Sequence, residues 1–533
     1  MKWSQIGCIL ILVATAVALA LRLPQLDQRP MHGDEAVGAV KFGSLLEENY
    51  YRYDPFEYHG PTLYYLTLIP AWLSSDRLLS DVNEYTLRIV PVFFGTLLIL
   101  LLLPVATGLG WPAVAATSIL TAISPAMVFY SRYYIHEMLL VVFTLAAIVA
   151  GYRYIRSKGI GWALLLGISL GLMYATKETS IVAFGSMLLA LLLMLVLERR
   201  PIIAALKKLN PWHCAAIAAA AVVVSVLFFS SFFTNPRGII DSLIPWGNYF
   251  NRAAYNEWHI HPWYYYLEML IFTRYTGGPI WSEALLVVLA AIGFIYAMSR
   301  RVPKLGDTSL IRFIAFYTIL MTIMYSAIPY KTPWNMLGFL HGMILLAGIG
   351  LIAIFEYLHS NLARVLVALL LLAGGIHLTW QAYQASYRYH ADPANPYVYA
   401  HSSIDVLDIV EQVYAFADAH PEGRNLVVEV ICTAGDYWPL PWYLRSFPNV
   451  GWWDRVNENV PPAPIILASP SVEQALIRKL YELPAAGEKN LYVPLLTSYK
   501  ELRPGVELRG YVMKDLWDSF QQRQTPFDPS PND

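Results

Sequence analysis

The chain has 533 residues, of which 57% are hydrophobic and only 14% are charged, and its formal net charge at pH 7 is −1. Soluble domains carry about 25% charged residues, so this composition excludes an ordinary soluble protein and favours an integral membrane protein. The near-neutral charge also lacks the excess of Lys and Arg that a nucleic-acid-binding surface needs. We therefore expect lipid, and no nucleic acid, as a partner.

Apolar stretches that can cross a bilayer, which takes about 17–25 residues, occur about eleven times. In chain order they are residues 5–22, 87–107, 111–130, 134–154, 160–176, 179–197, 213–233, 281–298, 310–328, 335–355 and 362–380. The first stretch also resembles a signal peptide, because Ala18-Leu19-Ala20 looks like a cleavage site. We favour a retained helix, since further spans follow it.

The basic residues indicate how the spans are oriented. If eleven spans alternate, the short loops rich in Lys and Arg fall on one side together with Lys2; they contain Arg153, Arg156, Lys158, Arg199, Arg200, Lys207, Lys208, Arg300, Arg301, Lys304 and Arg364. The positive-inside rule makes that side cytoplasmic. We therefore predict a cytoplasmic N-terminus and an extracytoplasmic tail after Trp380.

The first outer loop, residues 23–86, is too long for a plain connection. Its apolar residues recur at helical spacing over 36–46 and 63–69, so we predict two short helices along the membrane surface. Asp34 and Glu35 stand near the start of the first one, where a carboxylate can cap free backbone amides. Capping and catalysis do not exclude each other.

Polar motifs gather on the predicted outer face. They lie in the first outer loop and in three turns, at residues 32–35, 59–61, 131–137, 176–178 and 328–335. A purely structural turn needs little more than Gly, Asn or Pro, so these charged turns favour a single site. The outer loop 234–280 is rich in Trp, Tyr and His, which is typical of an interfacial aromatic belt and also suits a lipid or sugar groove.

The composition changes near residue 390, where apolar spans end. We predict a transmembrane domain over residues 1–385 and an extracytoplasmic α/β domain over 390–533. The second domain has expected helices at 403–420 and 471–483 and expected strands at 425–432, 463–468 and 490–495. Its aromatic segment, residues 436–445 with Trp452–Trp453, either contacts sugar or acceptor or packs against the membrane face.

Three cations lie on the same predicted face as the acidic pair: Arg132, Lys177 and Lys331. Such residues can bind the phosphate of a lipid-linked donor, and Tyr330 shares with Lys331 a turn stiffened by two prolines. Each lysine equally suits an anchor that reaches lipid headgroups.

A carboxylate beside a sugar phosphate indicates glycosyl transfer. Asp34 would accept the proton of an acceptor hydroxyl as that hydroxyl attacks the anomeric carbon, and the cations would stabilise the departing phosphate. Glu35 or His59 would orient Asp34 or raise its basicity. Alternatively, Asp34 and Glu35 with His136 and Glu137 would hold a divalent cation, Mg²⁺, Mn²⁺ or Zn²⁺. The sequence leaves open whether any metal is used.

The layout resembles the C-type (GT-C) membrane glycosyltransferases, in particular the protein O-mannosyltransferase and aminoarabinose-transferase-like superfamily, and within it a prokaryotic flippase-activity-associated branch. The motifs that carry the resemblance are His32-Gly-Asp-Glu-Ala36, residues 52–62, His59-Gly-Pro-Thr-Leu-Tyr-Tyr65, Arg88, Ser131-Arg-Tyr-Tyr134, Ala175-Thr-Lys-Glu178 and residues 329–335. The resemblance covers about residues 1–380. We group Arg88 with the phosphate-binding residues.

The resemblance implies a polyprenyl-phosphate sugar donor, an extracytoplasmic site, inverting transfer and Asp34 as the general base. Relatives have Lys or His before Pro-Pro-Leu, whereas this chain has His59-Gly60 and a single Pro there, so the match at His59 is partial. The acceptor is a protein or a lipid or glycan. The alternative function is a non-catalytic transporter or flippase partner for lipid-linked sugars. Transporters place ionisable residues at the bilayer midplane, whereas here they lie at the ends of spans, which favours an enzyme.

Overall fold

The computed structural model describes residues 3–56, 59–245, 259–275, 277–299, 306–485, 487 and 489–524. The chain forms two compact units: Met1–Leu26, Ser44–Arg77 and Val82–Tyr399 make the first, and Asp27–Gly43, Leu78–Asp81 and Ala400–Asp533 make the second. The sequence had placed residues 27–43 in the loop of the transmembrane domain. The structure groups this segment, which contains the acidic pair, with the C-terminal residues.

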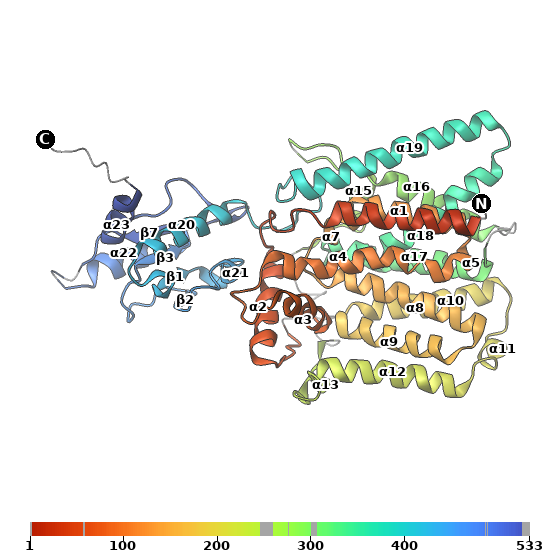
Figure 1. The fold of residues 1–533 in the computed structure, drawn as a ribbon, viewed down its shortest axis with the longest axis horizontal. Coiled ribbons are helices and arrows are strands. Elements are labelled where there is room, and N and C mark those ends of the chain that lie inside the picture. The colour runs from red at the N-terminus through yellow and green to blue at the C-terminus, as the bar shows by residue number, and fades with distance from the viewer. Residues whose placement is uncertain are drawn as a thin grey trace. The chain divides into compact units, whose positions relative to one another are not determined.

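The first unit is built of helices (Figure 1). In chain order they are α1 (Trp3–Arg22), α3 (Thr62–Ser74), α4 (Glu84–Leu100), α5 (Ala106–Leu109), α6 (Trp111–Ile123), α7 (Pro125–Tyr130), α8 (Glu137–Ser157), α9 (Ile160–Thr176), α10 (Ser180–Leu197), α11 (Ile202–Leu206), α12 (Pro211–Phe229), α13 (Arg237–Asp241), α15 (Tyr265–Ile271), α16 (Ala284–Met298), α17 (Thr308–Ala327), α18 (Leu337–Tyr357) and α19 (Asn361–Tyr383). Helix α2 (Gly33–Glu48) begins in the second unit and ends in the first.

Each predicted span contains an apolar helix. Within the described residues, 8 helical stretches are long and apolar enough to cross a membrane, and three shorter apolar helices, α6, α9 and α16, occupy the remaining predicted spans. The chain is thus a multi-pass membrane protein. Helix α9 packs between α8 and α12, and α16 packs on α18 (Figure 1).

The predicted span 111–130 is not one helix. It breaks after Ile123, where Ser124 has a ψ of 122° and Pro125 starts α7. Proline cannot donate to a preceding turn, and the residue before it avoids the helical region. The sequence signal for this break was Ser124-Pro125 itself.

The two predicted surface helices are present as α2 and α3. Several residues used in the predictions lie outside the described part of the chain: Lys2, Arg300, Arg301 and Lys304 of the basic loops, and residues 246–258 of the aromatic outer loop.

The second unit contains one mixed sheet of order β2-β1-β3-β7-β4. Strands β1 (Val428–Ile431), β2 (Val450–Trp453) and β3 (Ile465–Ala468) are parallel, while β7 (Arg509–Met513) runs antiparallel to both β3 and β4 (Tyr492–Pro494). The other elements are the hairpin β5 (Glu501–Arg503) and β6 (Val506–Glu507), and helices α20 (Asp405–Ala419), α21 (Leu440–Tyr443), α22 (Glu473–Ile477) and α23 (Lys514–Gln524).

The predicted helices and the strands at β1, β3 and β4 are confirmed, whereas β2 and β7 were missed. Helix α22 covers the sheet through a core that includes Leu476, Ile431 and Ile466. Strands β1 and β3 are buried along their whole length; β3 is an apolar run, and β1 is apolar apart from Glu429. Strand β2 is only half-buried. In β7, half-buried and buried residues alternate, beginning with the half-buried Arg509 and the buried Gly510. Neither strand therefore shows an apolar run in the sequence.

Candidate functional site

The acidic pair stands in the first turn of α2, which begins at Gly33. Glu35 Oε2 accepts a hydrogen bond of 3.1 Å from the backbone N–H of His32. The backbone N–H of Ala36 donates to His32 O at 2.9 Å and closes the first helical turn. A glutamate that reaches back to the residue capping its own helix is half of a capping box. Glu35 therefore fixes the start of the helix.

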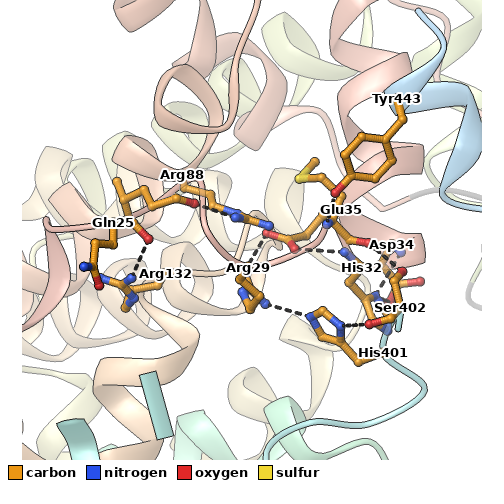
Figure 2. A network of polar contacts seen from close by, with 12 residues as sticks. Gln25, Arg29, His32, Asp34, Glu35, Arg88, Arg132, His401, Ser402 and Tyr443 are labelled. Atoms are coloured by element: carbon orange, nitrogen blue, oxygen red, sulfur yellow. Dashed lines mark hydrogen bonds and ion pairs between the residues drawn. The ribbon is translucent and has the colours of Figure 1, made fainter. Parts of the chain in front are cut away.

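Glu35 also contacts a cation of its own chain. Arg29 Nη2 lies 3.0 Å from Glu35 Oε1, and both side chains are buried (Figure 2). A buried carboxylate needs such a partner because burial removes its hydration. The sequence left Glu35 open between orienting its neighbour and binding a cation, and in the structure the cation it contacts is Arg29.

Asp34 differs from its neighbour because its side chain is 60% exposed, with Oδ2 lying 4.0 Å from His32 Nδ1. The backbone N–H of Asp34 donates to the same Nδ1 at 3.0 Å, which places the proton of a neutral His32 on Nε2. The Asp34 carboxylate is thus accessible at a helix N-terminus, an end that favours negative charge. This accessibility is what a general base needs.

The loop before α2 is held by residues of the C-terminal segment. Tyr443 and Ser402 bind the backbone of Met31, and His401 lies against Arg29 (Figure 2). None of these contacts was predicted. The available signal was Arg29, a charged residue close to the acidic pair; nothing in the sequence pointed to its partners.

Three of the predicted motifs meet in the first unit. The Gly60 backbone N–H donates to Thr176 O at 3.1 Å, and the Thr62 hydroxyl donates to the Thr176 hydroxyl at 2.8 Å. His136 Nε2 donates to Gly60 O at 2.9 Å. The approach is so close that a Cβ on Gly60 would lie 2.1 Å from Ala175 O. The segments around 60, 136 and 176 therefore form one packed cluster.

His59 is oriented by Glu178. Its Nδ1 lies 2.8 Å from Glu178 Oε2, and the Tyr53 hydroxyl donates to Glu178 Oε1 at 2.9 Å. Burial by itself raises the pKa of Glu178, but the charge and hydrogen bonds of His59, with the Tyr53 bond, outweigh it and hold that pKa below its ordinary value. The predicted role of His59, to orient Asp34, stays a prediction.

Lys177 is paired with Glu137. The Lys177 ammonium donates to Glu137 Oε1, and both side chains are buried. In this buried ion pair at the N-terminus of α8 each charge balances the other. The role of Lys177 in phosphate binding stays a prediction.

Arg132, predicted to bind the donor phosphate, contacts the backbone carbonyls at the end of α1, and its phosphate-binding role stays a prediction. Its guanidinium donates to Arg22 O at 2.8 Å and Pro24 O at 2.7 Å. It also donates to Gln25 O at 3.0 Å (Figure 2). Carbonyls at a helix C-terminus carry partial negative charge and attract a cation. Arg88 acts similarly, because its Nη1 donates to Leu26 O at 2.5 Å while its side chain is fully buried. Both arginines thus hold the chain that leads to α2.

Lys331 is also held by backbone carbonyls. Its ammonium donates to Ile328 O and, at 3.1 Å, to His261 O, and the residue is 1% exposed. Tyr330 lies half-exposed beside it, with its ring centroid 5.3 Å from that of His259. The roles of these residues in phosphate binding stay predictions.

No three His, Cys, Asp or Glu residues in the described part of the chain are grouped so that they could hold a metal ion. Glu35 and Glu137, two of the predicted ligands, are each paired with a cationic side chain. The proposed divalent cation on Asp34, Glu35, His136 and Glu137 stays a prediction of the sequence.

An apolar cavity of about 580 Å³ lies among α9, α10, α12 and α13. Its lining is almost wholly hydrophobic and includes Tyr174, Phe184, Met187 and Phe229. Among its lining residues, the Tyr174 hydroxyl donates to Ser242 O at 2.8 Å. An apolar cavity with few polar groups suits a hydrocarbon chain.

Residues 66–237 match the family described as dolichyl-phosphate-mannose-protein mannosyltransferase. No curated protein sequence matches the chain. Among solved structures, ArnT from Cupriavidus metallidurans in the apo state is similar with a TM-score of 0.61 and 15% identity, covering 94% of this chain and 97% of that one. ArnT bound to undecaprenyl phosphate gives a TM-score of 0.57 at the same identity and coverage.

The apo oligosaccharyltransferase of Archaeoglobus fulgidus is similar with a TM-score of 0.53 and 15% identity, over 87% of this chain and 69% of that chain. At this identity the likeness to solved structures shows the fold alone, which the chain shares with ArnT and the oligosaccharyltransferase. The chain is thus a multi-pass membrane protein with this fold, and its residues 66–237 match the dolichyl-phosphate-mannose-protein mannosyltransferase family.

Proposed function

We propose that this protein transfers a sugar from a polyprenyl-phosphate donor to an extracytoplasmic protein, lipid or glycan acceptor, with inversion, and that Asp34 is the general base. The observation that carries the proposal is the contrast within the acidic pair. Glu35 is buried against Arg29, whereas Asp34 is 60% exposed on a turn that Glu35 fixes. One carboxylate is structural, and the other is available for proton transfer.

The lipid part of the donor is supported by the apolar cavity of about 580 Å³. A similar fold, ArnT, has been seen with undecaprenyl phosphate. We infer that the isoprenoid chain of the donor lies in this cavity while its phosphate stays at the outer end of the helices. The positive-inside distribution of basic residues predicts that this end, and the C-terminal domain, lie outside the cytoplasm.

The test compares cells that lack the protein with cells that carry the wild type, Asp34→Asn or the control Glu48→Gln, a second exposed carboxylate of α2. Mass spectrometry of envelope lipids and proteins identifies the glycan that disappears with the protein. General-base removal typically costs about 10²–10⁴-fold in rate, so Asp34→Asn should restore none of that glycan and Glu48→Gln all of it. Full restoration by Asp34→Asn, at equal expression, would show that another group takes the proton.

A further inference from the structure

We propose that the C-terminal domain positions the base: Ser402, Tyr443 and His401 clamp the loop 29–32 and thereby fix where Asp34 stands. This inference rests on the proposed function, since it assigns to the domain a part in placing the same carboxylate. It makes the three residues positioning residues, because none of them bonds to Asp34 itself. We call this set of contacts the Met31 clamp.

The clamp holds the backbone of Met31 on both sides. The Met31 N–H donates to the Tyr443 hydroxyl oxygen at 2.8 Å, and the Ser402 hydroxyl donates to Met31 O at 2.6 Å. Met31 and Ser402 are fully buried, and Tyr443 is nearly so. A buried backbone N–H or C=O that loses its partner is strongly unfavourable, so these bonds select one path for the loop.

The second anchor runs through Arg29. Its Nη2 contacts Glu35 at 3.0 Å, and its Nη1 lies 3.4 Å from His401 Nε2. His401 Nδ1 donates to Ser402 O at 2.9 Å, which leaves Nε2 as the acceptor for Arg29. Burial, together with the charge of Arg29, lowers the pKa of His401 well below its ordinary value and keeps the ring neutral, as this arrangement requires.

The contacts at Met31 and the contacts at Arg29 together hold the first turn of α2. Met31 precedes His32, the residue that caps the helix, and Glu35 closes the same turn from within by its bond to the His32 N–H. Asp34 lies between them with an exposed side chain. Its position is therefore set by the turn rather than by its own contacts, and the turn is set by residues located 371 and 412 positions from Met31 along the chain.

The consequence for catalysis is specific. A displacement of about 1 Å in a reacting group can cost about 100-fold in rate. We expect Tyr443→Phe and Ser402→Ala each to lower transfer by roughly tenfold and the double variant to approach Asp34→Asn. Binding of undecaprenyl phosphate should stay within about twofold of wild type, since the clamp residues lie outside the proposed lipid cavity.

The experiment uses the full-length protein in detergent and in cells. Hydrogen exchange at the amides of residues 31–36 reports the clamp without reference to activity, and the glycan identified in the deletion cells reports transfer. Ser402→Thr keeps the hydroxyl and should restore both. The matched control is Tyr492→Phe, which removes a tyrosine hydroxyl that bonds the backbone elsewhere in the same unit, by donating to Ala463 O at 2.9 Å.

Support requires faster exchange at residues 31–36 in Tyr443→Phe and Ser402→Ala, slower glycan formation, and wild-type behaviour of the control. Unchanged exchange in both variants would overturn the clamp. Faster exchange with undiminished glycan would overturn its positioning role, provided that Asp34→Asn still abolishes the glycan. If cells carrying Asp34→Asn still form the glycan, Asp34 is not the base. The positioning role of the clamp then fails as well, even if the exchange data show that the clamp exists.

Discussion

At the scale of single residues, adjacent carboxylates of one turn have different environments. Glu35 reaches back to the N–H of His32 and is buried against Arg29, while the Asp34 side chain is mostly exposed, with Oδ2 4.0 Å from His32 Nδ1. The sequence predicted the pair and its position at a helix start, because an acidic residue there satisfies free amides. It did not predict which of the two would be buried, since that depends on Arg29 folding back onto Glu35.

Lys177 and Glu137 form a buried ion pair in the first unit, and this pair offers a clear test. Glu137→Gln leaves the Lys177 ammonium buried without its counter-charge, so we expect a loss of about 3–5 kcal/mol in unfolding free energy. Unfolding followed by circular dichroism in detergent measures it. The control is Asp518→Asn, which breaks the exposed Lys514–Asp518 pair of α23 and should change stability by less than about 0.5 kcal/mol. Equal effects of the two variants would contradict the assignment.

The lowered pKa of Glu178 predicts how the stability of the protein depends on pH. Its pKa is lower in the folded protein than the ordinary value of 4.5, so the folded state favours its ionised form. The resulting stability is fully present above about pH 4.5 and is lost as the pH falls through the folded pKa. Glu178→Gln should therefore cost about 1.5–3 kcal/mol at pH 7 and progressively less below pH 4.5. Unfolding temperatures of both proteins between pH 3 and 7 measure this; a difference that grows toward acid pH would reverse the sign and refute it.

At the scale of elements, helix ends on the proposed outer face are joined by backbone contacts as well as by side chains. The chain around Gly60 touches the end of α9 directly, through the 3.1 Å bond to Thr176 O. Arg132 and Arg88 hold the carbonyls that follow α1. The sequence predicted charged turns at these places and a phosphate-binding role for the arginines, which stays a prediction; their carbonyl partners leave no mark in a sequence.

Gly60→Ala tests the backbone contact. A Cβ at this position would lie 2.1 Å from Ala175 O, so the two segments must move apart, and we expect a loss of about 1–3 kcal/mol in unfolding free energy. The control is Gly185→Ala in α10, where a Cβ meets nothing within 4 Å and a helix gains about 0.5–1 kcal/mol. Thermal unfolding of the two variants should thus shift in opposite directions. A neutral Gly60→Ala would mean that the contact is not close.

At the scale of the whole molecule, the predicted orientation has a direct test. With Cys8, Cys214 and Cys432 replaced by alanine, Tyr499→Cys of the C-terminal domain should react with a membrane-impermeant maleimide in intact cells, because that domain is predicted to be extracytoplasmic. Lys208→Cys, in a basic loop, should react only after the cells are lysed. Both positions are exposed. The reverse pattern of labelling would invert the topology.

Apolar length and periodicity by themselves determined the membrane class, the place of each of the eleven helices, the two surface helices α2 and α3 and the buried strands of the C-terminal sheet. These features depend on local burial, which a run of residues records. Tertiary structure decided that Glu35 pairs with Arg29, that Arg132 caps α1, and that residues 27–43 belong with Ala400–Asp533. Arg132 meets a carbonyl 110 positions away, and even the Arg29–Glu35 pair, six positions apart, depends on the path of the loop between them. A lone arginine carries no trace in the sequence of which carbonyl or carboxylate it will meet.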